Sequence, residues 1–147
     1  MVRLSNPVGA PISKALVTRV VGAFRSRWPR ARGKAVTVAL VDRVISRRLN
    51  RAARGVNGPT DVLSFPSRDD ASWPRPVERI LGEVVICYPI AVRQAKTYGH
   101  SARREVIELL IHGLAHLAGF DHDTKIAAAK MSAFEASVAV RALSRSR

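Results

Sequence analysis

The stretch HGLAHLAGFDHD, residues 112–123, decides how the rest of the chain is interpreted. It holds three of the four histidines in the protein: His112, His116 and His122. The first two stand four residues apart in an apolar segment that is predicted to be helical, so both imidazoles lie on one face. Gly119 tolerates a left-handed backbone, so the helix can end there and the chain can bring His122 back toward the other two.

Three imidazoles in this arrangement predict a metal site with an open fourth position. Such sites are typical of catalytic zinc, whereas structural zinc is usually enclosed by four protein ligands. The alternative is that each histidine is an ordinary core or surface residue with a satisfied hydrogen bond. The helical spacing, the glycine and the third histidine together favour the metal site. The chain has only one other histidine, His100, so chance is a poor explanation for the clustering of the remaining three.

Length and composition predict one folded domain. The chain has 147 residues, of which 47% are hydrophobic, which suits a single core and is short for two. No apolar run approaches the length of a membrane span, and the N-terminus lacks the pattern of a signal peptide. Cys87 is the only cysteine, so we expect no internal disulfide, a reducing cytoplasmic location and a buried, unreactive thiol.

The charge indicates a polyanionic partner. Lys and Arg number 25 against 11 Asp and Glu, a formal net charge of +14, and 20 of the 25 cations are arginine. The planar guanidinium suits bidentate contact with phosphate, so nucleic acid is the expected partner. An arginine-rich organism would explain scattered arginines, but it explains clusters less well.

Periodicity predicts an α+β fold, with a mixed sheet of short strands between helices. The expected helices span residues 12–28, 42–53, 88–98 and about 101–118, and Thr124 is expected to cap a last helix that follows it. The expected strands span residues 36–41, 62–65 and 80–87, where Gly82 predicts a bulge or a close backbone approach. The proline-containing segment 66–76 is predicted to be a long loop, and the basic tail 141–147 is predicted to fray.

The helix predicted after the N-cap candidate Asp42 is basic, with five arginines and no acid between Arg43 and Arg54. Its apolar residues are expected to face the sheet: Val44, Ile45 and Leu49. Its outer stripe carries three arginines: Arg43, Arg47 and Arg51. A solvated basic face is the usual reading of such a stripe, but the net charge favours contact with RNA phosphates.

The histidine spacing also matches zinc proteases of the HExxHxxGxxH type. In those enzymes the Glu after the first histidine is the general base, and here that position is Gly113. Glu108 lies one turn earlier and can instead pair with Arg104 or Lys130. We therefore expect no peptide hydrolysis by the protease mechanism.

The histidine segment resembles the signature of the YbeY family of endoribonucleases, approximately HGxLHLxGYDH. Ala115 replaces the family's leucine and Phe120 its tyrosine. The block LNRAARGVNGPTDVLSFP, residues 49–66, is similar to the family's LNxxYRxxxxPTDVLSFP, with Ala53 in place of tyrosine and Arg54 retained. LGEVVIC, residues 81–87, is similar to the strand LGDIVI. The resemblance runs from about residue 36 to the end, and the first 35 residues add little.

The resemblance implies a single endoribonuclease domain over residues 1–147, built on a mixed four-stranded sheet flanked by helices. It implies one zinc ion held by His112, His116 and His122, and a functional arginine, Arg54, that meets the RNA backbone. It also implies cleavage of single-stranded RNA in 3′-end maturation of small-subunit ribosomal RNA, and ribosome quality control. The expected partners are ribosomal RNA, the small subunit and its proteins, with no membrane and no DNA.

We hypothesise that the arginines have two different roles in handling RNA. Arg54 stabilises negative charge on the scissile phosphate, while the arginine stripe guides the strand. Asp121 either orients a ligand imidazole through a hydrogen bond or caps the turn. Thr60 and Asp61 are expected to have a structural role at the start of a strand.

Two other functions stay open at this point. In the first, the protein is a non-catalytic assembly factor, in which zinc stabilises the fold and the arginines bind ribosomal RNA. A fourth protein ligand would support that function. In the second, the protein is a metalloprotease with an unusual base, against which Gly113 and the net charge both count.

Overall fold

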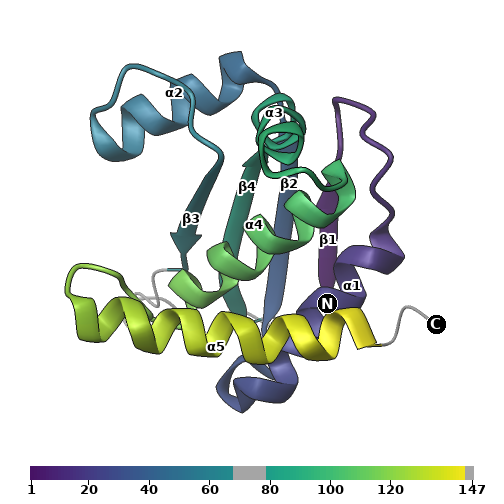
Figure 1. Cartoon of the computed structure of the whole chain (residues 1–147), viewed down its shortest axis with the longest axis vertical. Coiled ribbons are helices and arrows are strands. Elements are labelled where there is room, and N and C mark those ends of the chain that lie inside the picture. The colour runs from purple at the N-terminus through teal and green to yellow at the C-terminus, as the bar shows by residue number, and fades with distance from the viewer. Residues whose placement is uncertain (68–78, 145–147) are drawn as a thin grey trace.

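The computed structural model describes residues 1–67 and 79–144, which form one α+β domain around a four-stranded mixed sheet (Figure 1). The strands are β1 (Val2–Ser5), β2 (Ala35–Val41), β3 (Val62–Pro66) and β4 (Ile80–Cys87). They lie in the order β1-β2-β4-β3, with β3 antiparallel to β4 and the other pairs parallel. The helices are α1 (Lys14–Arg27), α2 (Arg43–Arg54), α3 (Tyr88–Tyr98), α4 (Ala102–Leu117) and α5 (Lys125–Ser144).

The two faces of the sheet carry cores of different size. Alternate residues of the central strands, such as Val38 and Val84, pack with α1 and α4 into the main core. The opposite residues form a smaller cluster with Leu49 of α2: Ala39, Val41, Leu63 and Val85. Figure 1 shows α4 lying against the sheet, with α5 crossing it on the same side. The main core therefore supports the helix that carries two of the histidines.

The expected helices and strands are present, and their predicted caps form. Asp42 Oδ1 accepts a hydrogen bond from Ile45 N (2.9 Å), and Thr124 Oγ1 accepts one from Ala127 N (3.0 Å). Strand β1 was not predicted, because its alternation of apolar and polar residues extends over only four residues, and pairing with β2 is what makes it a strand. Most of the loop predicted at residues 66–76 falls outside the described residues.

The prediction that residues from Arg141 onward fray is wrong for the part that the structure describes. Helix α5 continues to Ser144, because Ala142 is buried in the main core and holds the last turn in place. Residues 145–147 lie outside the described chain. Cys87 is buried, as expected, and burial raises the pKa of its thiol.

The predicted buried face of α2 is partly wrong. Val44 and Ile45 are 57% and 37% exposed, whereas Ser46 and Asn50 are buried. Ser46 Oγ donates to Thr60 O (2.9 Å) and accepts from Thr60 N (3.0 Å), and Asn50 Nδ2 donates to Gly58 O (2.8 Å). The segment before β3 packs on α2 with irregular backbone whose polar groups need partners. Polar side chains therefore occupy the contact that periodicity assigned to apolar ones.

Two glycines mark close approaches between the sheet and its neighbours. At Gly82 the pairing with β2 shifts by one residue, and a Cβ atom would lie 2.5 Å from Phe65 O, so both the bulge and the close approach are confirmed. At Gly113 of α4 a Cβ atom would lie 2.5 Å from Val84 Cγ1 and 3.1 Å from Ser64 Oγ. Gly113 thus points into the sheet, where the carboxylate of a protease base would have no room.

We expect Gly113→Ala to lower the free energy of unfolding by about 1–3 kcal/mol, because the added methyl group collides with a β-branched side chain in a packed core. Gly22→Ala in α1 is the matched control, since its Cβ meets nothing within 4 Å. That change should stabilise the protein by roughly 0.5–1 kcal/mol. Urea unfolding of both variants measures the difference, and equal stability of Gly113→Ala and wild type would contradict the packing argument.

Candidate metal centre

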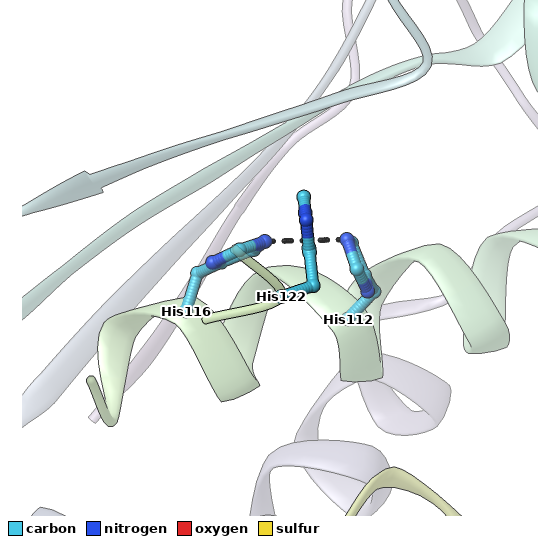
Figure 2. A group of neighbouring side chains, drawn as sticks. All are labelled: His112, His116 and His122. Carbon is cyan, nitrogen blue, oxygen red and sulfur yellow. Dashed lines mark hydrogen bonds between the residues drawn. The ribbon is translucent and has the colours of Figure 1, made fainter. Parts of the chain in front are cut away.

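Three imidazoles meet at the C-terminal end of α4. His112 and His116 project from the same face of the helix, and His122 returns from the turn that follows it (Figure 2). The ring centroids are 4.7 Å apart for His112 and His116, 5.9 Å for His112 and His122, and 5.3 Å for His116 and His122. One ring nitrogen of each lies within 4.8 Å of the other two, so the three can hold one metal ion.

The turn that carries His122 is held by aromatic packing. Gly119 adopts a φ of +96°, which ends the helix as the sequence predicted. The Phe120 ring stacks on Phe134 at 4.4 Å and meets Trp28 edge-on at 5.5 Å. Helices α1 and α5 therefore fix the position of the turn, and through it the approach of His122 to α4.

The outer ring nitrogens of the two α4 histidines are anchored. His112 Nδ1 lies 2.9 Å from Glu135 Oε1 of α5, and His116 Nδ1 lies 3.1 Å from Phe120 O. A carbonyl only accepts, so His116 Nδ1 carries a proton and its Nε2 keeps a lone pair. The two Nε2 atoms are 3.2 Å apart and face the same point, which is the arrangement that metal-binding histidines require (Figure 2).

The same contacts shift the titration of the histidines in opposite directions. The hydrogen bond that His112 donates to the Glu135 carboxylate raises the pKa of His112. Burial lowers the pKa of His116, and the neighbouring His112 and His122 lower it further. Near neutral pH this favours an uncharged His116, whose Nε2 lone pair is available to a cation.

Glu135 was not singled out from the sequence. It lies 23 residues after His112 in another helix, so no local spacing connects the two. The one available signal was that Glu135 is the sole acid of α5. Asp121, for which the sequence left imidazole orientation and turn capping both open, accepts a hydrogen bond from His122 N (2.7 Å). Its placement matches turn capping, and the hydrogen bond from Asp123 lowers the pKa of Asp121.

The three histidines line a cleft of about 1080 Å³ between α2 and the edge strand β3. Arg54, at the end of α2, lies in the wall of this cleft, and so does Asp61. The arginines Arg43, Arg47 and Arg51 lie exposed on α2 and are not in the wall. The structure therefore brings Arg54 to the histidines and leaves the predicted arginine stripe outside the cleft.

Residues at the margins of the cleft are engaged in structural contacts. Asp61 Oδ1 accepts from Val62 N (2.8 Å) and its Oδ2 accepts from Gln94 Nε2 (3.2 Å), in keeping with the structural role expected for it. Glu108 pairs with Arg104 at 3.1 Å, as one alternative predicted, and lies outside the cleft wall. Glu108 is therefore not placed to replace the missing protease base.

We expect Glu135→Ala to weaken metal binding by about 10- to 100-fold, because the His112 imidazole loses the partner that fixes its orientation. Glu135→Gln keeps an oxygen acceptor and should therefore lose less metal affinity than Glu135→Ala. Glu108→Gln is the control, since it removes a carboxylate that does not touch the three histidines. Competition with a zinc chelator measures the affinity of each variant, and unchanged affinity in Glu135→Ala would show that Glu135 does not position His112.

None of the described helices combines the length and apolarity needed to cross a bilayer. Residues 8–142 match the family model described as endoribonuclease YbeY. Endoribonuclease YbeY of Moorella thermoacetica is 42% identical over 132 residues, covering 86% of this chain and 84% of its own length. The Roseiflexus castenholzii protein of the same name is 40% identical over 116 residues, covering 78% and 73%.

Structural comparison agrees with the sequence matches. The solution structure of a Thermotoga maritima protein superimposes with a TM-score of 0.58 at 26% identity, covering 94% of this chain and 89% of the other. The family match includes 28 residues before position 36, the segment in which the sequence alone showed little resemblance. The histidine turn, the β3 segment and the surrounding fold occur together in one matched region, and the chain therefore belongs to the YbeY family of endoribonucleases.

Proposed function

We propose that this protein is a zinc-dependent endoribonuclease that cleaves single-stranded RNA. The observation that carries the proposal is that three converging imidazoles and Arg54 line one cleft. Membership of the endoribonuclease family supports RNA as the substrate, and the net charge of +14 supports a polyanion. One cleft thus combines a binding site for a divalent metal ion with a guanidinium group that can bind phosphate.

The donor set fits zinc. Three imidazole nitrogens are its usual ligands in catalytic sites, and two of them are already oriented by Glu135 and Phe120 O. No described carboxylate or thiol joins the three donors as a fourth ligand, so the site leaves a position for water or substrate. Zinc held there would supply Lewis acidity at the scissile phosphate. This open position favours an enzyme over an assembly factor in which zinc only stabilises the fold.

The protein's own residues bind the phosphate, attract the RNA strand and position the third histidine. Arg54 binds the scissile phosphate and stabilises the charge that develops on it in the transition state. The exposed arginines of α2 lie next to Arg54 on the same helix and attract the strand electrostatically: Arg43, Arg47 and Arg51. Asp121 holds the turn that presents His122, so its contribution is to place a ligand.

We further propose that the RNA is ribosomal. The family resemblance supports action on the 3′ end of small-subunit ribosomal RNA, in the cytoplasm, with the small subunit and its proteins as partners. The strongly basic surface is suited to a large RNA particle. A role in ribosome quality control follows if the same cleavage removes defective particles.

The test is cleavage by purified protein containing one equivalent of zinc. Labelled single-stranded RNA, the same RNA in a duplex, and casein are incubated with wild type, with and without chelator. We expect chelator-sensitive cleavage of the single strand, little cleavage of the duplex and no cleavage of casein, because Gly113 leaves no room for the protease base. Tight RNA binding without cleavage would favour the assembly factor instead, and chelator-sensitive casein cleavage would favour a protease.

A further inference from the structure

Strand β3 forms one wall of the metal cleft and is an outer strand of the sheet (Figure 1). In an antiparallel ladder, the peptide groups of alternate residues point toward the partner strand. Cys87 N donates to Asp61 O (2.8 Å) and Ser67 N donates to Leu81 O (3.1 Å), both in the register of the β3–β4 ladder. Residues 61, 63, 65 and 67 therefore face β4, and the peptide groups of residues 62, 64 and 66 face outward.

Of the three outward residues, only Ser64 has both a donor and an acceptor that no residue in the described part of the chain occupies. Val62 N–H already donates to Asp61 Oδ1 (2.8 Å), and Pro66 has no N–H. Within the described ranges β3 pairs with β4 alone, so its ladder leaves the backbone N–H and C=O of Ser64 without a partner strand. The edge of β3 thus presents one peptide donor and one peptide acceptor side by side.

The position of Ser64 links this edge to the metal centre. Ser64 Oγ donates to Gly113 O (2.8 Å), and Gly113 directly follows His112. Ser64, Arg54 and the three histidines all line the same cleft. Apolar side chains of Leu49, Ala52 and Phe65 line it as well. The surroundings of the free peptide groups therefore suit a flat ring with a polar edge.

We propose that the backbone N–H and C=O of Ser64 bind the Watson–Crick edge of an unpaired nucleobase beside the scissile phosphate. Every base carries a hydrogen-bond donor next to an acceptor on that edge, so the contact selects unpaired bases more than particular ones. The inference rests on the proposed RNA cleavage and deepens it. In a duplex the same edge is occupied by the complementary base, which gives a physical reason for preferring single strands.

The other ligand for a free strand edge is an extended peptide, which would add a strand to the sheet. Such a peptide needs donors at alternate residues along the edge. Among residues 1–67 and 79–144, no partner occupies the N–H of Ser64, whereas Asp61 occupies that of Val62 and Pro66 has none. Arg54, which lines the same cleft, also favours a phosphate-bearing ligand. The edge is therefore better suited to a base than to a strand.

The test separates the Ser64 N–H from its side chain. Ser64→Pro removes the outward N–H at a position where an edge strand tolerates proline, although it also loses the hydroxyl. Ser64→Ala is the matched control, because it loses the bond to Gly113 O and keeps the N–H. Each protein is titrated with single-stranded RNA carrying uridine, or an apolar isostere of uridine without donors and acceptors, at each position that flanks the cut.

At one of these positions we expect wild type and Ser64→Ala to bind uridine about three- to tenfold more tightly than the isostere, and Ser64→Pro to show no preference. Equal binding of both RNAs by wild type at every position would overturn the proposal, whether or not Ser64→Pro folds. Competition by an extended peptide that Ser64→Pro abolishes would overturn it in favour of strand addition. Because the readout is affinity, its failure is distinct from loss of RNA cleavage, which would refute the proposed function.

Discussion

His116→Ala is expected to abolish stable zinc binding and to lower RNA cleavage by about 10³-fold or more, since metal catalysis supplies most of the activation. The ring centroid of His116 lies 4.7 Å from that of His112 and 5.3 Å from that of His122, and its Nε2 is 3.2 Å from that of His112. Removing it leaves two imidazoles, which is one fewer than catalytic zinc sites use. His116 is only half-buried and is not part of the main core, so the apo protein should remain folded.

The measurement is zinc content by elemental analysis beside a single-turnover cleavage rate, for wild type and His116→Ala. Glu108→Ala is the control, because it truncates an exposed residue of the same helix outside the cleft. The control should keep both zinc and activity. Near-wild-type cleavage by metal-free His116→Ala would show that the three histidines are not the catalytic centre.

Arg54→Ala should slow cleavage at saturating RNA by about 10²-fold, the loss seen when one electrostatic donor to a transition state is removed. Arg54 ends α2 at the wall of the cleft and is not one of the three histidine ligands, so zinc content should stay unchanged. Affinity for single-stranded RNA should fall only modestly, because the other arginines share the phosphate contacts.

Arg51→Ala is the matched control for Arg54→Ala. Arg51 lies one turn earlier on α2 and outside the cleft wall. It is preferred to Arg47, whose Nε donates to Asn57 Oδ1 (2.8 Å) and so also holds a loop. Arg51→Ala should weaken RNA binding and reduce its salt dependence, with little effect on the saturated rate. If Arg54→Ala cleaves at the wild-type rate once RNA is saturating, Arg54 only binds.

Sequence alone was sufficient for the features that depend on short-range spacing. The pair His112 and His116 lies on one helical face because i and i+4 always do, and Gly119 ends the helix because it accepts a positive φ. Strands β2, β3 and β4, the caps at Asp42 and Thr124, and the bulge at Gly82 were likewise predicted from local patterns. The resemblance of the two motif blocks then indicated the family that the comparisons show.

Contacts between distant segments were decided only by the tertiary structure. Glu135 reaches His112 across 23 residues, and Ser46 and Asn50 are buried because the segment before β3 needs their hydrogen bonds. Periodicity describes which side of a helix is apolar, but it does not describe the unpaired backbone that packs against that side. The same holds for β3. The sequence predicts a strand, but two features of the assembled sheet decide that the Ser64 peptide groups point outward: β3 is an outer strand, and residues 61, 63, 65 and 67 are the ones that bond to β4. Which peptide groups remain free depends on which strand lies alongside, and that is a property of the assembled sheet.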